Sequence, residues 1–161
     1  MKSKLKLLMT ESLPGITKQK KRKFKTTQKE VIELYHILNK QIFDNKLILS
    51  EIIVKSRCRQ YWGMCHSITW KPIAGKVNVK IILSDKWYCK QWLIMTLAHE
   101  MCHQYQWDII GPERVKAGKS PIMSHGPSFF IHRDRLEKFD IPLKRAHGTK
   151  RWFQHQNLFK C

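Results

Sequence analysis

The sequence predicts an α+β domain with its helices and strands in separate blocks. The chain has 161 residues, 42% of them hydrophobic, which suits one compact domain with basic extensions. A helical apolar pattern comes first, three short strand-like stretches follow, and two more helical stretches complete the domain. We therefore expect a folded unit over residues 26–143, a basic flexible arm before it (1–25) and a basic, aromatic tail after it (144–161).

The first expected helix covers residues 27–43. Thr27 and Glu30 have the spacing of a capping box, in which the two side chains satisfy backbone N–H groups of the first turn. Apolar residues then recur at helical spacing, at Val31, Leu34, Tyr35, Leu38 and Ile42.

Three strands are expected next, at 47–57, 61–70 and 76–83. In the last of them, apolar residues alternate with Asn78 and Lys80, which is the pattern of a half-buried strand. Because short turns join the three stretches, we expect a small, mainly antiparallel three-stranded sheet.

A second long helix is expected over residues 85–107, with Ser84 or Asp85 as its N-cap. Residues 108–124 contain several glycines and prolines and predict a loop. A last helix is expected over residues 128–139. The apolar face of the second helix includes Leu93, Leu97 and Met101.

Positive charge is concentrated at the two ends of the chain, whose formal net charge is +19. Residues 1–25 contain nine lysines and arginines against one glutamate, and residues 141–161 contain five against no acidic residue. A polyanion is the natural partner of such ends, and nucleic acid is the commonest one.

The tail also interleaves its cations with aromatic residues, a combination that suits single-stranded or junction DNA because exposed bases can stack on aromatic rings. The alternative is that Trp152 and Phe153 pack back onto the domain. The expected DNA contacts are Lys20, Lys21, Arg22, Lys23, Lys144, Arg145, Lys150, Arg151, Trp152 and Phe153.

The sequence favours an intracellular protein. Its five cysteines are an odd number without a CxxC pair, which favours reduced thiols. The N-terminus lacks the long apolar stretch and the cleavage site of a signal peptide. No apolar run approaches the roughly 18 residues that a membrane span requires, so no membrane partner is expected.

A metal-binding motif lies within the second long helix. His99 and His103 are four residues apart, so both imidazoles project from one face and can reach a single ion. Glu100 lies beside them, off the ligand axis, where it can take a proton from water instead of coordinating. This HExxH pattern predicts a hydrolytic zinc site with Glu100 as general base.

A catalytic zinc site needs a third protein ligand. The spacing HExxHxxGxxH is absent, because position 106 is Gln. His125 is the preferred candidate, since it precedes a helix and follows a segment long enough to fold back on the motif. His132 is a rival, and a glutamate ligand would have to be Glu113 or Glu137.

The HExxH motif followed by the sequence SHGPSF (residues 124–129) resembles the SprT-like, or Spartan-like, zinc metalloproteases, a family that includes proteases acting on proteins crosslinked to DNA. The resemblance covers roughly residues 27–143 and also includes a glycine-containing strand at 59–65. It implies a zincin-like fold that binds one Zn²⁺ ion. It also implies roles for four residues: His99, His103 and His125 as ligands and Glu100 as the base.

Two features depart from the family pattern. The segment from His103 to His125 is longer than expected, and we expect no C-terminal zinc ribbon of the kind that many members carry, because Cys161 is the only cysteine of the sequence after Cys102. The arm and the tail are then the best remaining places to hold DNA.

The leading hypothesis is a monomeric, DNA-associated zinc endopeptidase that degrades DNA-bound or DNA-crosslinked proteins. The alternative is a nucleic-acid-binding zinc domain with little or no proteolytic activity. Glu100 favours the enzyme, because a purely structural site needs no general base. A zinc enzyme with a small-molecule substrate is less well supported, since neither a P-loop nor a GxGxxG motif is present.

Overall fold

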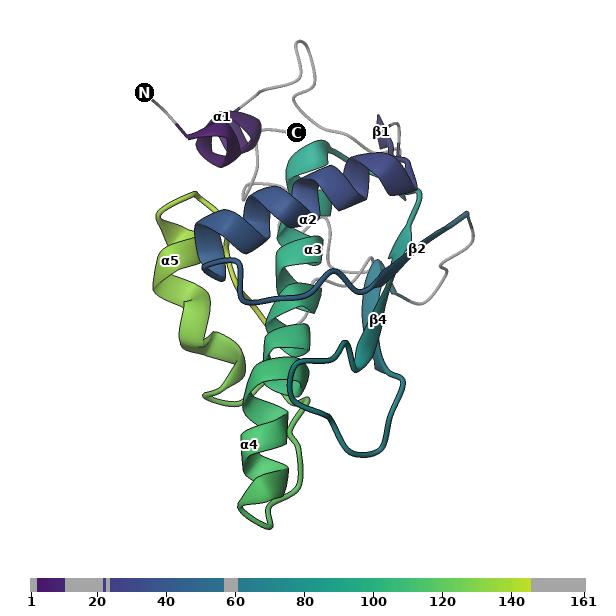
Figure 1. Ribbon diagram of the computed structural model, residues 1–161. Coiled ribbons are helices and arrows are strands. Elements are labelled where there is room, and N and C mark those ends of the chain that lie inside the picture. The colour runs from purple at the N-terminus through teal and green to yellow at the C-terminus, as the bar shows by residue number, and fades with distance from the viewer. Residues whose placement is uncertain (1–2, 11–21, 23, 57–60, 146–161) are drawn as a thin grey trace.

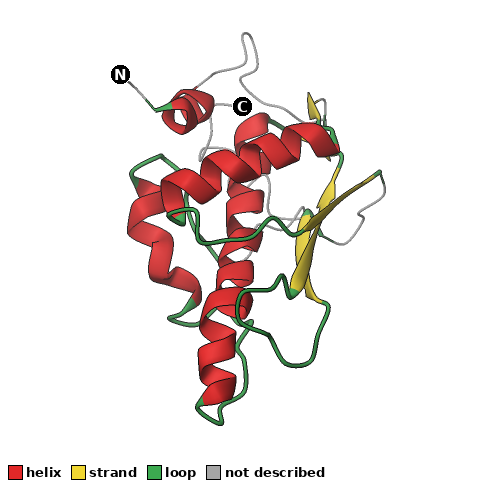
Figure 2. Ribbon diagram, viewed as in Figure 1, coloured by secondary structure: helices red, strands yellow, loops and turns green. Residues whose placement is uncertain are grey.

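A computed structural model describes residues 3–10, 22, 24–56 and 61–145. Five α-helices and two short sheets make up this part of the chain, with the helices gathered on one side of the strands (Figures 1 and 2). The fold is therefore α+β, as the sequence predicts. The elements in order are α1 (Lys4–Thr10), β1 (Phe24–Lys25), α2 (Gln28–Ile42), β2 (Glu51–Lys55), β3 (Gly63–Ser67), β4 (Val79–Ser84), β5 (Lys86–Trp87), α3 (Lys90–Tyr105), the π-helical turn η1 (Gln106–Ile110), α4 (Gly111–Lys116), the 3₁₀ turn η2 (Phe129–His132) and α5 (Arg133–Glu137).

The three expected strands form one sheet in the order β2-β4-β3, but the sheet is mixed. Strand β3 pairs with β4 in antiparallel fashion, whereas β2 runs parallel to β4. The expectation of a mainly antiparallel sheet is therefore wrong for one of the two pairings. Alternation predicts a strand but not its partner. The near-complete burial of β4 follows from its central place in the sheet.

Helix α2 follows the sequence prediction closely. The Thr27 side chain accepts a hydrogen bond from the backbone N–H of Glu30 at 3.2 Å and caps the first turn. Its buried face carries the apolar residues that the periodicity selects, and it packs against α3 and β2.

Helix α3 begins at Lys90, five residues later than expected. Lys86 and Trp87 pair instead with Phe24 and Lys25 in the small β1–β5 sheet, and the Trp87 side chain is fully buried. Residues 91–104 of α3 are all buried, so this helix runs through the middle of the domain with neighbours on every side (Figure 1).

The predicted loop over 108–124 is largely wrong, because the helix continues to Lys116 through η1 and α4. Pro112 has no N–H to donate and would clash within a regular helix. Here it lies in the first turn of α4, directly after the wider π-helical turn, in which Gly111 N–H bonds to Gln106 O. The π-turn thus allows the helix to pass a Gly-Pro pair.

Part of the expected basic arm belongs to the folded domain. Residues 4–10 form α1, and Leu5 and Met9 are buried in the core. Lys6 of this helix forms an ion pair with Asp140 at 2.6 Å. Helix α1 therefore combines an exposed Lys4 and a half-buried Lys6 with an apolar face that the high charge of the arm concealed.

The cysteines also differ from the expectation of reduced thiols throughout. Cys65 and Cys102 are free, but Cys89 is disulfide-bonded.

Within the described part of the chain, no helix combines the length and the apolar character that crossing a bilayer requires.

Candidate metal centre

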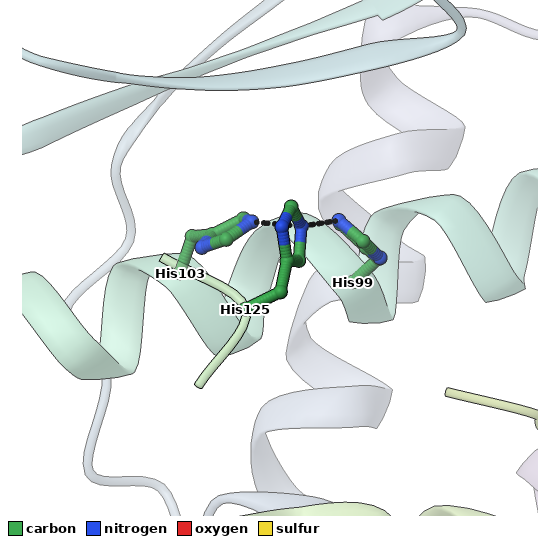
Figure 3. A group of neighbouring side chains, drawn as sticks. All are labelled: His99, His103 and His125. Atoms are coloured by element: carbon green, nitrogen blue, oxygen red, sulfur yellow. Dashed lines mark hydrogen bonds between the residues drawn. The ribbon is translucent and has the colours of Figure 1, made fainter. Parts of the chain in front are cut away.

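Three histidine side chains from two distant segments converge on one point. His99 and His103 project from the same face of α3, one helical turn apart, and His125 arrives from the segment before η2 (Figure 3). The Nε2 atom of His125 lies 3.1 Å from the Nε2 atom of His103 and 3.1 Å from that of His99. Among the described residues, these three are the group placed to share a metal ion.

The ring of Phe129 packs against all three imidazoles. Its centroid lies 4.7 Å from that of His99, 4.6 Å from that of His103 and 4.8 Å from that of His125, and its side chain is fully buried. In the sequence, Phe129 is noticeable only as the end of the SHGPSF element. Its role is to form an apolar floor that holds the three rings in place.

Gln106 connects the two segments that carry the histidines. Its Oε1 atom accepts a hydrogen bond from Nδ1 of His103 at 2.9 Å. Its Nε2 atom donates to the carbonyl of Ser124 and to Oγ of Ser128, both at 2.8 Å. In the sequence, Gln106 is noticeable only as a departure from a glycine spacing, and no motif identifies its role.

The Gln106 contact also fixes the protonation of His103. An amide oxygen only accepts, so the His103 proton lies on Nδ1 and its Nε2 presents a lone pair to the cluster. Burial lowers the pKa of His103 to about 4, despite the opposing Gln106 hydrogen bond, and so keeps the ring neutral.

These residues fit a zinc ion. With His103 protonated on Nδ1, its Nε2 has no proton, and the single Nε2 atom of His125 cannot both donate to His103 and accept from His99, so at most one of the two Nε2–Nε2 contacts is a hydrogen bond. A shared cation satisfies all three nitrogens. Nitrogens about 2.0–2.1 Å from a tetrahedral zinc are roughly 3.3 Å apart, close to the 3.1 Å observed.

Glu100 is buried beside the cluster and faces strand β3. Burial raises the pKa of its carboxyl to about 8, and a hydrogen bond from the backbone N–H of Cys65 opposes that rise. The close approach of β3 depends on Gly63. A Cβ atom at that position would lie 2.8 Å from Thr96 Cγ2 and 3.2 Å from Glu100 Cγ. The glycine-containing strand expected from the sequence therefore packs directly over the motif.

The rival ligands lie elsewhere. His132 is buried between Phe43 and Tyr105, with ring centroids 4.7 Å and 4.5 Å away. Glu113 is exposed on α4 and Glu137 is exposed at the end of α5. None of the three belongs to the histidine cluster.

The expected DNA contacts are only partly within the described residues. The guanidinium of Arg22 lies 4.2 Å from the centroid of the Trp62 ring. Arg145 lies close enough to His125 to lower the pKa of that imidazole, although burial is the larger cause. Outside the described residues lie Lys20, Lys21, Lys23, Lys150, Arg151, Trp152 and Phe153.

The fold and the site together define an α+β domain with a three-histidine cluster that could hold a metal ion. Comparison with family models identifies this class more closely: the SprT-like family model matches residues 31–147, most of the chain, and the chain belongs to the SprT-like family. No curated protein sequence matches the chain significantly.

Proposed function

We propose that this protein is a zinc-dependent endopeptidase that acts on proteins bound or crosslinked to DNA. The observation that carries the proposal is the juxtaposition of the three converging Nε2 atoms with the buried carboxyl group of Glu100. Membership of the SprT-like family supports a metalloprotease-type domain.

In this proposal His99, His103 and His125 would hold one zinc ion, which when bound would supply a Lewis acid for the scissile carbonyl and the attacking water. Glu100 accepts a proton from that water and passes it to the leaving amine. A carboxylate that takes up a proton and then releases it performs both halves of this transfer. Gln106 holds the His103 ring, and Phe129 excludes water from the back of the site.

Charge supports the DNA association. The chain carries a net charge of +19, and both ends are rich in lysine and arginine. Arg145 lies near His125, so the start of the basic tail is beside the proposed active site. We further propose that the protein is an intracellular monomer and that its tail and arm supply contacts to single-stranded or junction DNA.

The alternative is a nucleic-acid-binding domain in which zinc only stabilises the fold. The position of Glu100 favours the enzyme. Burying a carboxyl group of raised pKa beside the cluster costs stability and has no purpose in a structural site.

The decisive experiment is proteolysis of a basic protein bound to DNA, measured with and without the DNA. The wild-type enzyme should cleave it, and cleavage should stop with a zinc chelator and in Glu100→Gln. Zinc-replete protein that cleaves neither this substrate nor an unfolded peptide would favour the binding-domain alternative. The arm should be tested by replacing its lysines with glutamine and not by truncation, because truncation would remove the buried face of α1.

A further inference from the structure

The hairpin between β3 and β4, residues 68–78, exposes an unusual set of apolar side chains. Trp70 is 95% exposed, and Ile68 and Ile73 are 58% and 52% exposed. Single exposed apolar residues are common, but a group that includes a nearly bare indole indicates a surface with a partner.

The hairpin is firmly held on its inner side. The Asn78 side chain accepts from the Ile73 N–H at 2.8 Å and donates to the carbonyls of Ile73 and Lys76, and Asp108 of η1 accepts from both the Asn78 backbone and its amide. Trp70 is therefore presented by a rigid scaffold.

A second anchor lies at the start of α4, which runs beside the hairpin (Figure 1). Pro72 packs so closely there that a Cβ atom at Gly111 would lie 2.8 Å from its Cγ atom. The glycine that interrupts the long helix therefore also makes room for the hairpin.

A hollow of about 260 Å³ adjoins the indole and is lined by His66, Ser67, Ile68, Thr69 and Trp70. It is smaller than the roughly 300–1,000 Å³ of typical small-molecule pockets and suits a single planar group. Hydroxyl and imidazole groups in its lining can hydrogen-bond to the edge of such a group.

The charge around the hollow is positive. Residues 66–80 contain Lys71, Lys76 and Lys80 and no acidic residue. Two acidic residues adjoin this segment: Glu51 faces Lys80 across the β2–β4 pair, and Asp108 is buried with its carboxyl group bonded to Asn78 and Gln104. Within residues 66–80, Lys71 and Lys76 have no acidic residue beside them.

We propose that this hairpin binds single-stranded nucleic acid, with one base stacked on Trp70 over the hollow and with Lys71 and Lys76 contacting phosphates. Single strands expose both a base face and phosphates, and proteins bind them with this combination of aromatic and cationic side chains. An unfolded protein segment has the apolar groups but not the regular negative charge.

The location gives the contact a purpose, and this part of the inference depends on the proposed function. Strand β3 joins the hairpin to Cys65, whose N–H bonds to Glu100. Trp70 is five residues beyond Cys65, so the two Cα atoms are at most about 17 Å apart. A strand held at Trp70 would bring a protein attached to it within reach of the histidine cluster.

Anisotropy of a fluorescently labelled oligothymidylate tests the binding, with the full chain in a Glu100→Gln background so that binding is measured without cleavage. Trp70→Ala should weaken binding about 5- to 150-fold, and Trp70→Phe should recover most of the loss because a ring remains. Ile131→Ala is the matched control, a similarly exposed apolar residue outside the hairpin, and should bind like the parent. The melting temperature should be unchanged in Trp70→Ala.

The salt dependence tests the lysines. Lys71→Gln and Lys76→Gln should each make the slope of log K against log salt shallower by about 0.7, whereas Trp70→Ala should leave it unchanged. Unaltered binding in Trp70→Ala would overturn the proposal. So would unaltered DNA binding together with a higher KM for a DNA-free protein substrate, which would make the hairpin a protein-docking surface. A chain that binds through Trp70 but cleaves nothing would refute the proposed function and leave this inference intact.

Discussion

His125 and His132 are seven residues apart in one segment, yet they lie in opposite environments. His125 is half-buried, and its Nε2 atom faces two other imidazole nitrogens at 3.1 Å. His132 is 7% exposed, its ring packs edge-on against Phe43 and Tyr105, and its Nε2 atom has no hydrogen-bond partner in the described structure.

The comparison shows that a histidine near a metal motif is a candidate ligand only where its ring nitrogen faces the ring nitrogens of the other ligands. Aromatic neighbours make His132 a core residue, and burial lowers its pKa to about 4, so it stays neutral. His125 instead is half-buried on the segment before η2, and its Nε2 atom points at the histidines of α3.

The largest expected effect is on metal content. His99→Ala, His103→Ala and His125→Ala should each reduce bound zinc from one per chain to nearly none, because each removes a third of the protein ligands. His132→Phe should retain the full amount. Metal analysis after dialysis measures both. Zinc retained in His125→Ala but lost in His132→Phe, Glu113→Ala or Glu137→Ala would reverse the comparison.

The next effect is on catalysis. Glu100→Gln should retain zinc and the fold but lose about 10²–10⁴-fold in kcat, the usual contribution of a general base. Steady-state cleavage of an unfolded peptide, with zinc content measured on the same sample, separates this from metal loss. An unimpaired variant would show that another group takes the proton.

Replacing Gln106, which bonds to His103 of the cluster, should have a smaller effect, on zinc affinity. Gln106→Leu removes the His103 contact and both loop contacts and should weaken zinc affinity about 10- to 100-fold, as is usual for residues that orient metal ligands. Gln106→Glu keeps the acceptor for His103 and should recover part of that loss. Competition with a chromophoric chelator gives the affinities.

Gln104→Leu provides the control for this prediction. Gln104 is equally buried, but it bonds to Tyr35, Ile48 and Asp108, away from the histidines. This variant should lower the melting temperature and leave zinc affinity nearly unchanged. Equal losses of affinity in the two variants would mean that Gln106 acts only through general stability.

The smallest effect is on the free energy of unfolding at acid pH, to which His132 contributes. Burial is the largest cause that lowers the pKa of His132. Arg135 and Lys46 lower it further, and Asp44 opposes them. The unfolded state therefore binds the proton more tightly, and stability falls as the pH drops from about 6.5 towards 4. His132→Phe should remove about 2 kcal/mol of this loss by pH 5, which denaturant unfolding in a chelator measures. Parallel pH profiles for the two proteins would contradict a buried neutral His132.

The sequence alone determined the features that depend on local spacing. The capped helix at 28–42, the two motif histidines on one helical face and the presence of three strands all follow from periodicity within a few residues. SHGPSF and HExxH together also sufficed to indicate the family that the comparison with family models then identified.

Only the tertiary structure decided the features that depend on long-range contacts. Only the folded structure shows that Gln106 bonds to both segments that carry the histidines. It also shows that the helix continues through Gly111-Pro112 by way of a π-turn, although the local sequence predicts a loop. It also buried one face of a lysine-rich N-terminus and paired β2 in parallel with β4. Local patterns report which faces of an element are apolar, but partners are chosen by packing across the whole domain, and that information is not present in any single stretch of the chain.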